Sequence, residues 1–548
     1  LVSVATDRTG MGGMQRESIM ISRRTAIAAG LATSMGLLVE PALASTLFPV
    51  VETAQGKLRG LSSGGVAVFR GVHYAGDTSG ANRFMPPRPP ESWAGVRDAL
   101  HWGDVAPQVP GDRRSVYADL IMVDRNPSGM GENNLTLNLW TPKIDANARK
   151  PVIVVLHGGG FYSGSGNSVG MDGEQMARFT DSVVIAINHR LGAFGFLHLP
   201  AFAGEDFATS GTVGMQDIVA ALAWVRQNVA EFGGDPSRVL VYGQSGGGAK
   251  TSVLMAMPSA KGLFHRAGVM SGSALRMMPA EMASAATRRL LAALDIAPEN
   301  ARRLQQVPWT TLLETQAQLE MADRAKGEAP GAFAPVIDGI TLPRHPWDPD
   351  APAVSADVPM IISSALDERA YRMADFAMTE TGLMAFAQKL FGDDAAEAVA
   401  AYRAEAPGEK PFLLAARMDT DRTFRKSAFA QAERKAKQGG APVWTYLWKA
   451  PSPAAGGRFG AVHGIDVAPS LYNTRSALNG SSPEAVTLAA AIASSWAAFA
   501  ANGTPANPRI PQWPAYESTR RSTLIFDDPI TIAADPRGAM RKFHSREN

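Results

Sequence analysis

The sequence has 548 residues, of which 45% are hydrophobic, and its 53 Lys and Arg residues nearly balance its 51 Asp and Glu residues. A formal charge of +2, without a long basic run, argues against a nucleic-acid partner. The absence of cysteine excludes disulfides, a cysteine nucleophile and thiolate metal sites. We therefore expect a near-neutral globular protein with a large hydrophobic core.

Residues 1–44 are predicted to form a leader that precedes the folded domain. Ser-Arg-Arg at 22–24 comes before a small and apolar run over 25–39, and Pro-Ala-Leu-Ala follows at 41–44. These parts are typical of a signal peptide of the twin-arginine type, at about 20–44. We thus expect a bacterial protein exported to the periplasm or the medium. An uncleaved anchor or a fortuitous Ala-rich helix is the alternative, but the apolar run is too short to span a bilayer permanently.

After the leader, the apolar patterns predict a mostly parallel sheet with helices on both faces. Two short alternating segments, 50–53 and 58–61, indicate a small antiparallel start. Continuous apolar runs at 152–156 and 183–187 are typical of strands buried on both faces. An apolar stripe over 215–229 indicates a helix that ends at Gly-Gly-Asp-Pro. Further strands are expected at 135–140, 238–242, 266–270, 360–362 and 443–448.

Long helical stretches interrupt this pattern in the later part of the chain. Segments rich in Ala, Leu, Met and Arg, at about 275–355 and 373–436, are predicted to be helical insertions that form a cap. A final helix is expected over 484–501, ending at Gly503 before a Pro-rich tail. The alternation of strands and helices indicates the α/β class, with a mainly parallel sheet covered on both faces.

The most informative motif is Gly-Gln-Ser-Gly-Gly at 243–247, directly after the predicted strand over 238–242. A G-x-S-x-G sequence between a strand and a helix is the setting of a nucleophile elbow. Its turn is so tight that the flanking positions need glycine, because a Cβ would clash. The alternative is an ordinary Gly/Ser-rich loop, but the strand before it and the apolar helical face after it favour the elbow. Ser245 is therefore the predicted nucleophile.

A second glycine motif, His-Gly-Gly-Gly-Phe at 157–161, directly follows the predicted strand over 152–156. Acyl transfer develops negative charge on a carbonyl oxygen, and backbone N–H groups aimed at that oxygen stabilise it. Glycines allow the backbone to approach so closely. We predict that the amides of Gly159, Gly160 and Gly246 form an oxyanion hole. An ordinary glycine-rich turn is the alternative.

Chain order narrows the candidates for the general base. In hydrolases with such a nucleophile elbow, the serine precedes the acid and the acid precedes the histidine along the chain. The histidines that follow Ser245 are His265, His345, His463 and His544. His265 falls just before a strand, His345 lies between two prolines, and His544 lies in an expected frayed tail. His463 stands in a glycine-flanked loop after a predicted strand, and it is our candidate for the base.

The acid is expected after a strand that lies between Ser245 and His463. Residues 360–368 place two adjacent carboxylates, Asp367 and Glu368, just past a buried run. Either carboxylate could orient His463 and stabilise the imidazolium. A solvated acidic loop is the alternative, and the residues by themselves do not separate Asp367 from Glu368.

These motifs, with others in the same order, resemble the type-B carboxylesterases, relatives of bacterial para-nitrobenzyl esterases and of cholinesterases. The resemblance runs from about Val50 to the C-terminus. It implies the α/β-hydrolase fold, with residues 45–548 as one large catalytic domain. Its further motifs are Phe-Arg-Gly-Val-His-Tyr-Ala at 69–75, Arg-Phe-Met-Pro-Pro at 83–87, Trp-Ala-Gly-Val at 93–96, Leu-Thr-Leu-Asn-Leu-Trp at 135–140, Asn-His-Arg-Leu-Gly at 188–192 and Phe-Gly-Gly-Asp-Pro at 232–236.

The resemblance also implies roles for the site residues. The family's nucleophile corresponds to Ser245 and its histidine to His463. The family's acid is the glutamate of a D-E-G sequence, which corresponds to Glu368 rather than to Asp367. A serine that family members place near that glutamate corresponds to Ser271. The resemblance implies no cofactor and no metal.

Four positions depart from the family pattern. Gln244 and Gly246 replace the Glu and Ala of the usual G-E-S-A-G elbow, so that an amide replaces a charge beside the nucleophile. Arg369 stands where a glycine usually follows the acid. Asn134 stands where a cysteine is common, so the usual nearby disulfide is missing.

The predicted function is a serine carboxylesterase that hydrolyses small-molecule carboxylic esters through an acyl-enzyme intermediate. The nearest alternative is hydrolysis of a related acyl bond in a carbamate, an amide or a polyester, because the same machinery serves them all. A non-catalytic binding protein of the same fold is a further alternative, and the full set of triad positions argues against it. We expect no nucleic-acid partner and no stable membrane insertion.

Overall fold

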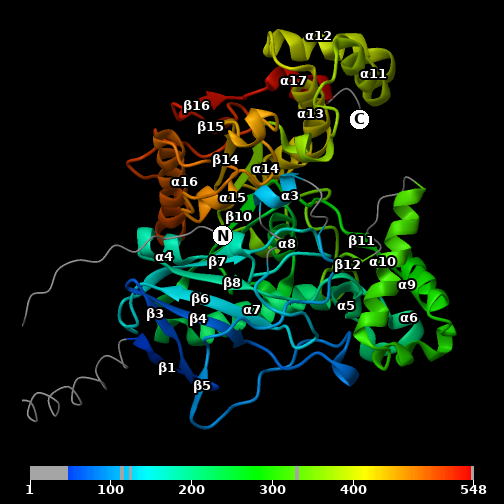
Figure 1. Ribbon diagram of the computed structural model, residues 1–548, viewed down its shortest axis with the longest axis vertical. Helices are drawn as coiled ribbons and strands as arrows, with labels where there is room; N and C mark the ends of the chain where they lie inside the picture. The colour runs from blue at the N-terminus through cyan, green and yellow to red at the C-terminus, as the bar shows by residue number, and fades with distance from the viewer. Residues whose placement is uncertain (1–46, 112–115, 122–125, 327–332, 545–548) are drawn as a thin grey trace, which may run out of the picture. The chain divides into compact units, whose positions relative to one another are not determined.

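An 11-stranded sheet is the centre of the structure (Figure 1). The computed structural model describes residues 47–111, 116–121, 126–326 and 333–544. The predicted leader and its twin-arginine signal lie outside these residues, and the described residues from Pro49 onward form one compact unit. The strands of the large sheet are β3 (Leu61–Ser63), β4 (Val66–His73), β6 (Thr136–Thr141), β7 (Lys150–Leu156), β8 (Val183–Ile187), β9 (Gly234–Gln244), β10 (Arg266–Met270), β13 (Met360–Ala365), β14 (Val443–Trp448), β15 (Ser522–Phe526) and β16 (Thr531–Ala534).

The middle of this sheet is parallel, as the continuous apolar runs indicate. The strand order is β16-β15-β14-β13-β10-β9-β7-β8-β6-β4-β3, and the strands from β8 across to β15 run in one direction. The strands at the two ends of the sheet pair antiparallel. Two smaller sheets consist of β1 (Val50–Thr53) with β2 (Gly56–Arg59) and β5 (Val96–Asp98), and of β11 (Met278–Pro279) with β12 (Val336–Ile337).

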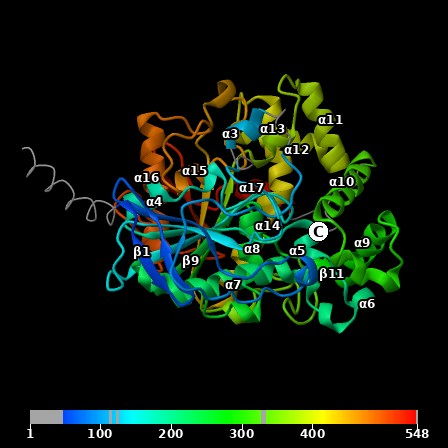
Figure 2. The same cartoon turned by 60° about the horizontal axis from the view of Figure 1, so that its bottom comes forward.

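Helices connect the strands and cover both faces of the sheet (Figures 1 and 2). The α-helices are α3 (Val116–Ile121), α4 (Glu174–Thr180), α5 (Gly192–Phe196), α6 (Pro200–Ala203), α7 (Val213–Asn228), α8 (Gly246–Leu254), α9 (Ala280–Ala293), α10 (Trp309–Ala325), α11 (Glu380–Phe391), α12 (Ala395–Glu405), α13 (Pro411–Thr420), α14 (Lys426–Gln438), α15 (Val467–Ser470), α16 (Pro483–Asn502) and α17 (Gly538–His544).

Alternate side chains of the central strands enter two separate hydrophobic cores. In β9, Val239 and Val241 belong to the core that includes the apolar stripe of α7. Leu240 and Tyr242 belong to the core on the opposite face, which includes α16. Successive side chains of a strand point to opposite faces, so a strand covered on both sides needs an apolar residue at every position.

Helix α16 is long and apolar enough to cross a membrane, by length and composition, in the part of the chain that the structure describes. It packs instead on the central sheet, with 56% of its most apolar window buried. Trp496 of α16 stacks on Tyr242 of β9 with 4.7 Å between ring centroids. The apolar character of α16 is therefore that of a core helix.

The two expected insertions are mainly helical where they are described. The first contains α9 and α10, and the second contains α11 to α14. Helices α11, α12, α13 and α17 share a small core of their own, which includes Leu383, Leu414 and Met540. Figure 1 shows α11 to α13 grouped together and apart from α9 and α10.

The Pro-rich tail expected after Gly503 contains more regular structure than the sequence predicts. Strand β15 pairs in parallel with β14, and β16 extends the sheet by one antiparallel strand. His544, which we expected in a frayed tail, is buried, and its Nε2 lies 3.0 Å from the hydroxyl of Tyr402. These strands are short and separated from the helix before them by prolines, so they give little periodicity to detect.

Candidate active site

Ser245 lies in the turn between β9 and α8, at the carboxyl edge of the parallel strands. Its φ of 57° falls in the left-handed region, which residues with a side chain rarely adopt. The Ser245 N–H donates to the carbonyl of Met270 at 2.8 Å, and the Ser245 carbonyl accepts from Ala249 at 2.9 Å. Contacts with the neighbouring strand β10 and with helix α8 thus hold this strained turn.

The glycine loop that follows β7 lies directly against the first turn of α8. Gly159 and Gly160 have φ of 84° and 63°. A Cβ on Gly246 would lie 2.3 Å from the Gly160 nitrogen, and a Cβ on Gly158 would lie 3.7 Å from the Cβ of Ser245. The structure therefore brings the residues with the predicted oxyanion donors together beside Ser245.

His463 and Glu368 meet at the same edge of the sheet. The Nδ1 of His463 lies 2.6 Å from Oε2 of Glu368. Glu368 follows β13, has no exposed surface, and accepts with its other oxygen from the N–H of Ala365 at 2.6 Å. His463 lies in the loop after β14 and is 5% exposed. With Nδ1 directed at the carboxylate, Nε2 is the nitrogen left to exchange a proton with another group.

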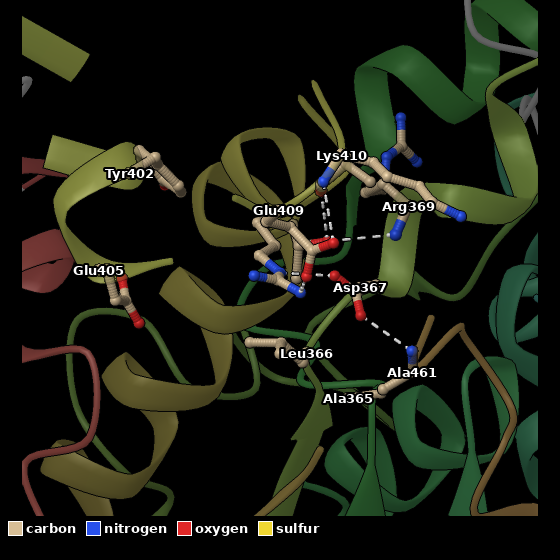
Figure 3. Close-up of polar contacts among 12 residues, drawn as sticks. Ala365, Leu366, Asp367, Arg369, Tyr402, Glu405, Glu409, Lys410 and Ala461 are labelled. Carbon is tan, nitrogen blue, oxygen red and sulfur yellow. Dashed lines mark hydrogen bonds and ion pairs between the residues drawn. The ribbon is translucent and has the colours of Figure 1, made fainter. Parts of the chain in front are cut away.

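The carboxylate of Asp367 has different partners and, among the described residues, no hydrogen bond to His463. Its Oδ1 accepts from Arg417 Nε at 2.7 Å, and its Oδ2 accepts from the N–H of Ala461 at 2.8 Å (Figure 3). Burial raises the pKa of Asp367 above its ordinary value, and the guanidinium of Arg417 partly offsets this effect. Asp367 therefore fastens the loop that carries His463 to the loop that carries Glu368.

A buried series of ion pairs supports the loop that carries Glu368. Arg425 donates to the carbonyl of Ala365 at 2.7 Å and pairs with Asp421 at 2.7 Å. Arg537 pairs with the other oxygen of Asp421, also at 2.7 Å. The residue that donates to Glu368 is thus itself connected to the segment just before α17.

The imidazole of His463 is enclosed by aromatic rings and by the side chain of Gln244. Tyr371 stacks on it with 5.2 Å between ring centroids, and Phe424 lies 4.8 Å away. The Gln244 Nε2 lies 3.2 and 3.3 Å from the two ring nitrogens. Nearly equal distances to both nitrogens place the amide over the ring face, because an in-plane position would overlap Cε1. Among the described residues, the Ser245 hydroxyl has no hydrogen bond to His463; such catalytic contacts often tighten only when substrate binds.

Among the described residues, Ser271 has no hydrogen bond to Glu368. Ser271 is buried at the end of β10, and its N–H donates to the carbonyl of Ser363 at 3.1 Å. In the described part of the chain, its hydroxyl has no hydrogen-bond partner. Arg369, in the usual position of a glycine, pairs with Asp419 of α13 at 2.6 Å.

Asp466 is a residue near the site that the sequence does not single out. It is fully buried and accepts a hydrogen bond from the hydroxyl of Tyr446 at 2.9 Å. Burial, with a further contribution from the charge of Glu368, raises the pKa of Asp466 to about 7. This carboxyl is thus partly protonated near neutral pH, which limits the negative charge close to His463.

The profile of the carboxylesterase family matches residues 48–542. The chain belongs to the carboxylesterase family. The para-nitrobenzyl esterase of Bacillus subtilis (strain 168) is 34% identical over 504 residues, which cover 90% of this chain and 98% of that protein. The phenmedipham hydrolase of Pseudarthrobacter oxydans is 34% identical over 507 residues, which cover 90% and 96%. The solved carboxylesterase structure from Geobacillus stearothermophilus has a TM-score of 0.76 at 33% identity and covers 90% of this chain and 99% of its own.

Family membership confirms the resemblance stated from the sequence, the α/β-hydrolase fold and the esterase class. The protein is a carboxylic ester hydrolase whose substrates are small-molecule esters. The individual roles of Ser245, Glu368, His463 and the glycine amides stay predictions that rest on the geometry above.

The contact between Gly246 and Gly160 generates a first test. In Gly246→Ala, the added methyl group would push the glycine loop away from α8, because it would lie 2.3 Å from a backbone nitrogen. We expect kcat for a short-chain nitrophenyl ester to fall about 10- to 100-fold, as for other small displacements of catalytic groups. The thermal midpoint, measured in parallel, should change little; unchanged kcat would show that the loop can move without cost to the reaction.

Proposed function

We propose that Ser245, His463 and Glu368 form the catalytic triad of this carboxylesterase and that it acts through a covalent acyl-enzyme. The observation that carries the proposal is the 2.6 Å contact between His463 Nδ1 and a fully buried Glu368, beside a serine in a strained elbow. A carboxylate at Nδ1 orients the imidazole and stabilises the imidazolium that forms during the reaction.

In the first half of the reaction, Nε2 of His463 takes the proton of the Ser245 hydroxyl. The Ser245 oxygen attacks the ester carbonyl carbon, and the carbonyl electrons move onto its oxygen. The amides of Gly159, Gly160 and Gly246 donate to that oxyanion. When the tetrahedral intermediate collapses, the bond to the alcohol oxygen breaks, and the His463 imidazolium gives its proton to the departing alcohol.

In the second half, water replaces the alcohol. His463 removes a proton from the water as its oxygen attacks the acyl carbon. The second tetrahedral intermediate uses the same three amides, and its collapse breaks the bond to the Ser245 oxygen. His463 returns the proton to Ser245, so one ester and one water give one acid and one alcohol.

The amide of Gln244 shapes the environment of this proton transfer. It lies against the His463 ring at 3.2 Å and carries no charge. In the described part of the chain, Glu368 is the carboxylate hydrogen-bonded to His463. The imidazolium is therefore stabilised mainly from the Nδ1 side. Because Gln244 replaces the glutamate of the usual family elbow, Glu368 is the one of these two positions that places a carboxylate beside the histidine.

The two neighbouring carboxylates allow a sharp test of the acid. We expect Glu368→Gln to lower kcat about 10⁴-fold, because a neutral amide does not stabilise the imidazolium. In Asp367→Asn, the side chain can still accept from Ala461, so kcat should fall far less. That variant should instead lose roughly 3 kcal/mol of unfolding free energy, since Arg417 loses a buried partner.

Kinetics and denaturation of both variants, made side by side, check this assignment. A larger loss of kcat in Asp367→Asn than in Glu368→Gln would move the role of the acid to Asp367. Labelling by a fluorophosphonate supplies the control for the nucleophile, with a mass shift expected on Ser245 of the wild type and absent from Ser245→Ala.

A related acyl bond is the second candidate substrate. The relative named phenmedipham hydrolase is as similar to this chain as the para-nitrobenzyl esterase is, at 34% identity each. Matched aryl acetates and aryl carbamates with the same leaving group separate the two candidates. We expect higher kcat/KM for the acetates, because the carbamate nitrogen makes the carbonyl less electrophilic; a preference for carbamates would reverse the assignment.

We also propose that the protein is exported, on the basis of Ser-Arg-Arg at 22–24 and the apolar run after it. In a bacterium with a working twin-arginine translocon, we expect the periplasmic enzyme to begin near Ser45, as read by N-terminal sequencing. Replacing Arg23 and Arg24 by Lys should retain the enzyme in the cytoplasm. Unimpaired export of the double variant would contradict the proposed route.

A further inference from the structure

Lys250 is a fully buried lysine on α8, the helix that begins beside Ser245, and the proposed reaction does not use it. In the described part of the chain, none of its hydrogen bonds goes to a carboxylate. An unpaired ammonium is unfavourable in such an environment. Burial accordingly lowers the pKa of Lys250 well below its ordinary value.

The amine of Lys250 reaches across to the base of the glycine loop. Its Nζ donates to the carbonyl of His157 at 2.9 Å, directly before Gly158. The Nδ1 of His157 lies 2.9 Å from the carbonyl of Gly158, and this contact braces the loop internally. A Cβ on Gly247 would lie 3.1 Å from the same His157 carbonyl, so helix and loop are already in close contact there. Lys250 therefore connects the base of the loop to α8 where the two segments are in close contact.

The surroundings of this hydrogen bond are polar but favour uncharged groups. His157 stacks on His189 with 5.0 Å between ring centroids. Burial lowers the pKa of both imidazoles well below the ordinary value, and nearby Lys250 adds to the effect. Among the described residues, the Nε2 atoms of both rings have no hydrogen-bond partner. The Nε2 atoms of these rings therefore add no hydrogen bond at the base of the loop, where Lys250 supplies a direct one from α8.

The oxyanion donors come from two separate segments. Gly159 and Gly160 belong to the loop, whereas Gly246 belongs to α8. All three amides must point at one oxygen atom, so the stabilisation depends on how the loop sits relative to the helix. We propose that Lys250 is a positioning residue of the oxyanion hole, which holds the loop on the helix through its bond to the His157 carbonyl. This inference rests on the proposed function.

A second buried lysine provides a matched control. Lys435 of α14 is also almost without exposed surface, and it donates to the carbonyls of Ser355 and Ala356 at 3.2 and 2.9 Å. Replacing either lysine by Met keeps the length of the side chain and removes the donors. Both variants are expected to have lower thermal midpoints, but only Lys250→Met should affect the reaction.

The readouts are kcat and KM for a short-chain nitrophenyl ester and the inhibition constant of an aryl trifluoromethyl ketone. The hydroxyl of an active serine adds to such a ketone to give a tetrahedral oxyanion. In Lys250→Met we expect kcat/KM to fall about 10- to 100-fold, with KM nearly unchanged. The inhibition constant should rise by a similar factor. In Lys435→Met both quantities should stay at wild-type values.

Wild-type kcat/KM and ketone affinity in Lys250→Met would overturn the proposal, and so would equal losses in the two Met variants. Should Lys250→Met fail to fold, Lys250→Gln keeps an N–H donor, and a smaller parallel change in the same two quantities is expected. Wild-type values in that variant would likewise overturn it. Failure of a fluorophosphonate to label Ser245 in the wild type would contradict the triad itself, which separates that failure from one of Lys250 alone.

Discussion

The active site depends on how closely the backbone can pack at the carboxyl ends of β7, β9 and β10. A Cβ on Gly247 would lie 2.0 Å from the carbonyl oxygen of Leu156, and one on Gly272 would lie 2.1 Å from that of Ser245. Side-chain carbons do not occur at such distances, so any other residue would force these segments apart. Because the nucleophile, the glycine loop and the neighbouring strand meet there, the same contact sets their relative positions.

The sheet could be predicted well where its strands are buried on both faces. The runs at 266–270 and 443–448 coincide with β10 and β14, because a doubly covered strand is apolar at every position. Strands β15 and β16 could not be predicted in the same way. They are short, and β16 lies at the edge of the sheet, where the apolar pattern is incomplete.

The residues of the candidate site also differ in whether they could be predicted from the sequence. Chain order and the loop context singled out His463, and the structure brings it to Glu368. Asp367 and Glu368 could not be separated from the residues alone, since adjacent side chains diverge only once the loop has its conformation. Asp466 and Lys250 gave no signal, because a charged residue looks the same in a sequence whether it is buried or exposed.

The ion pairs that support the loop carrying Glu368 also affect the order in which the site is completed during synthesis. The elbow has its main backbone contacts once Met270 has been made. Glu368 receives its hydrogen bond from Ala365, and that residue is braced through Arg425 and Asp421 by Arg537, far downstream. Chains are made and begin to fold from the N-terminus. A nascent chain can therefore hold its nucleophile in place long before its acid is secured, and hydrolytic competence requires the C-terminal segment to have folded.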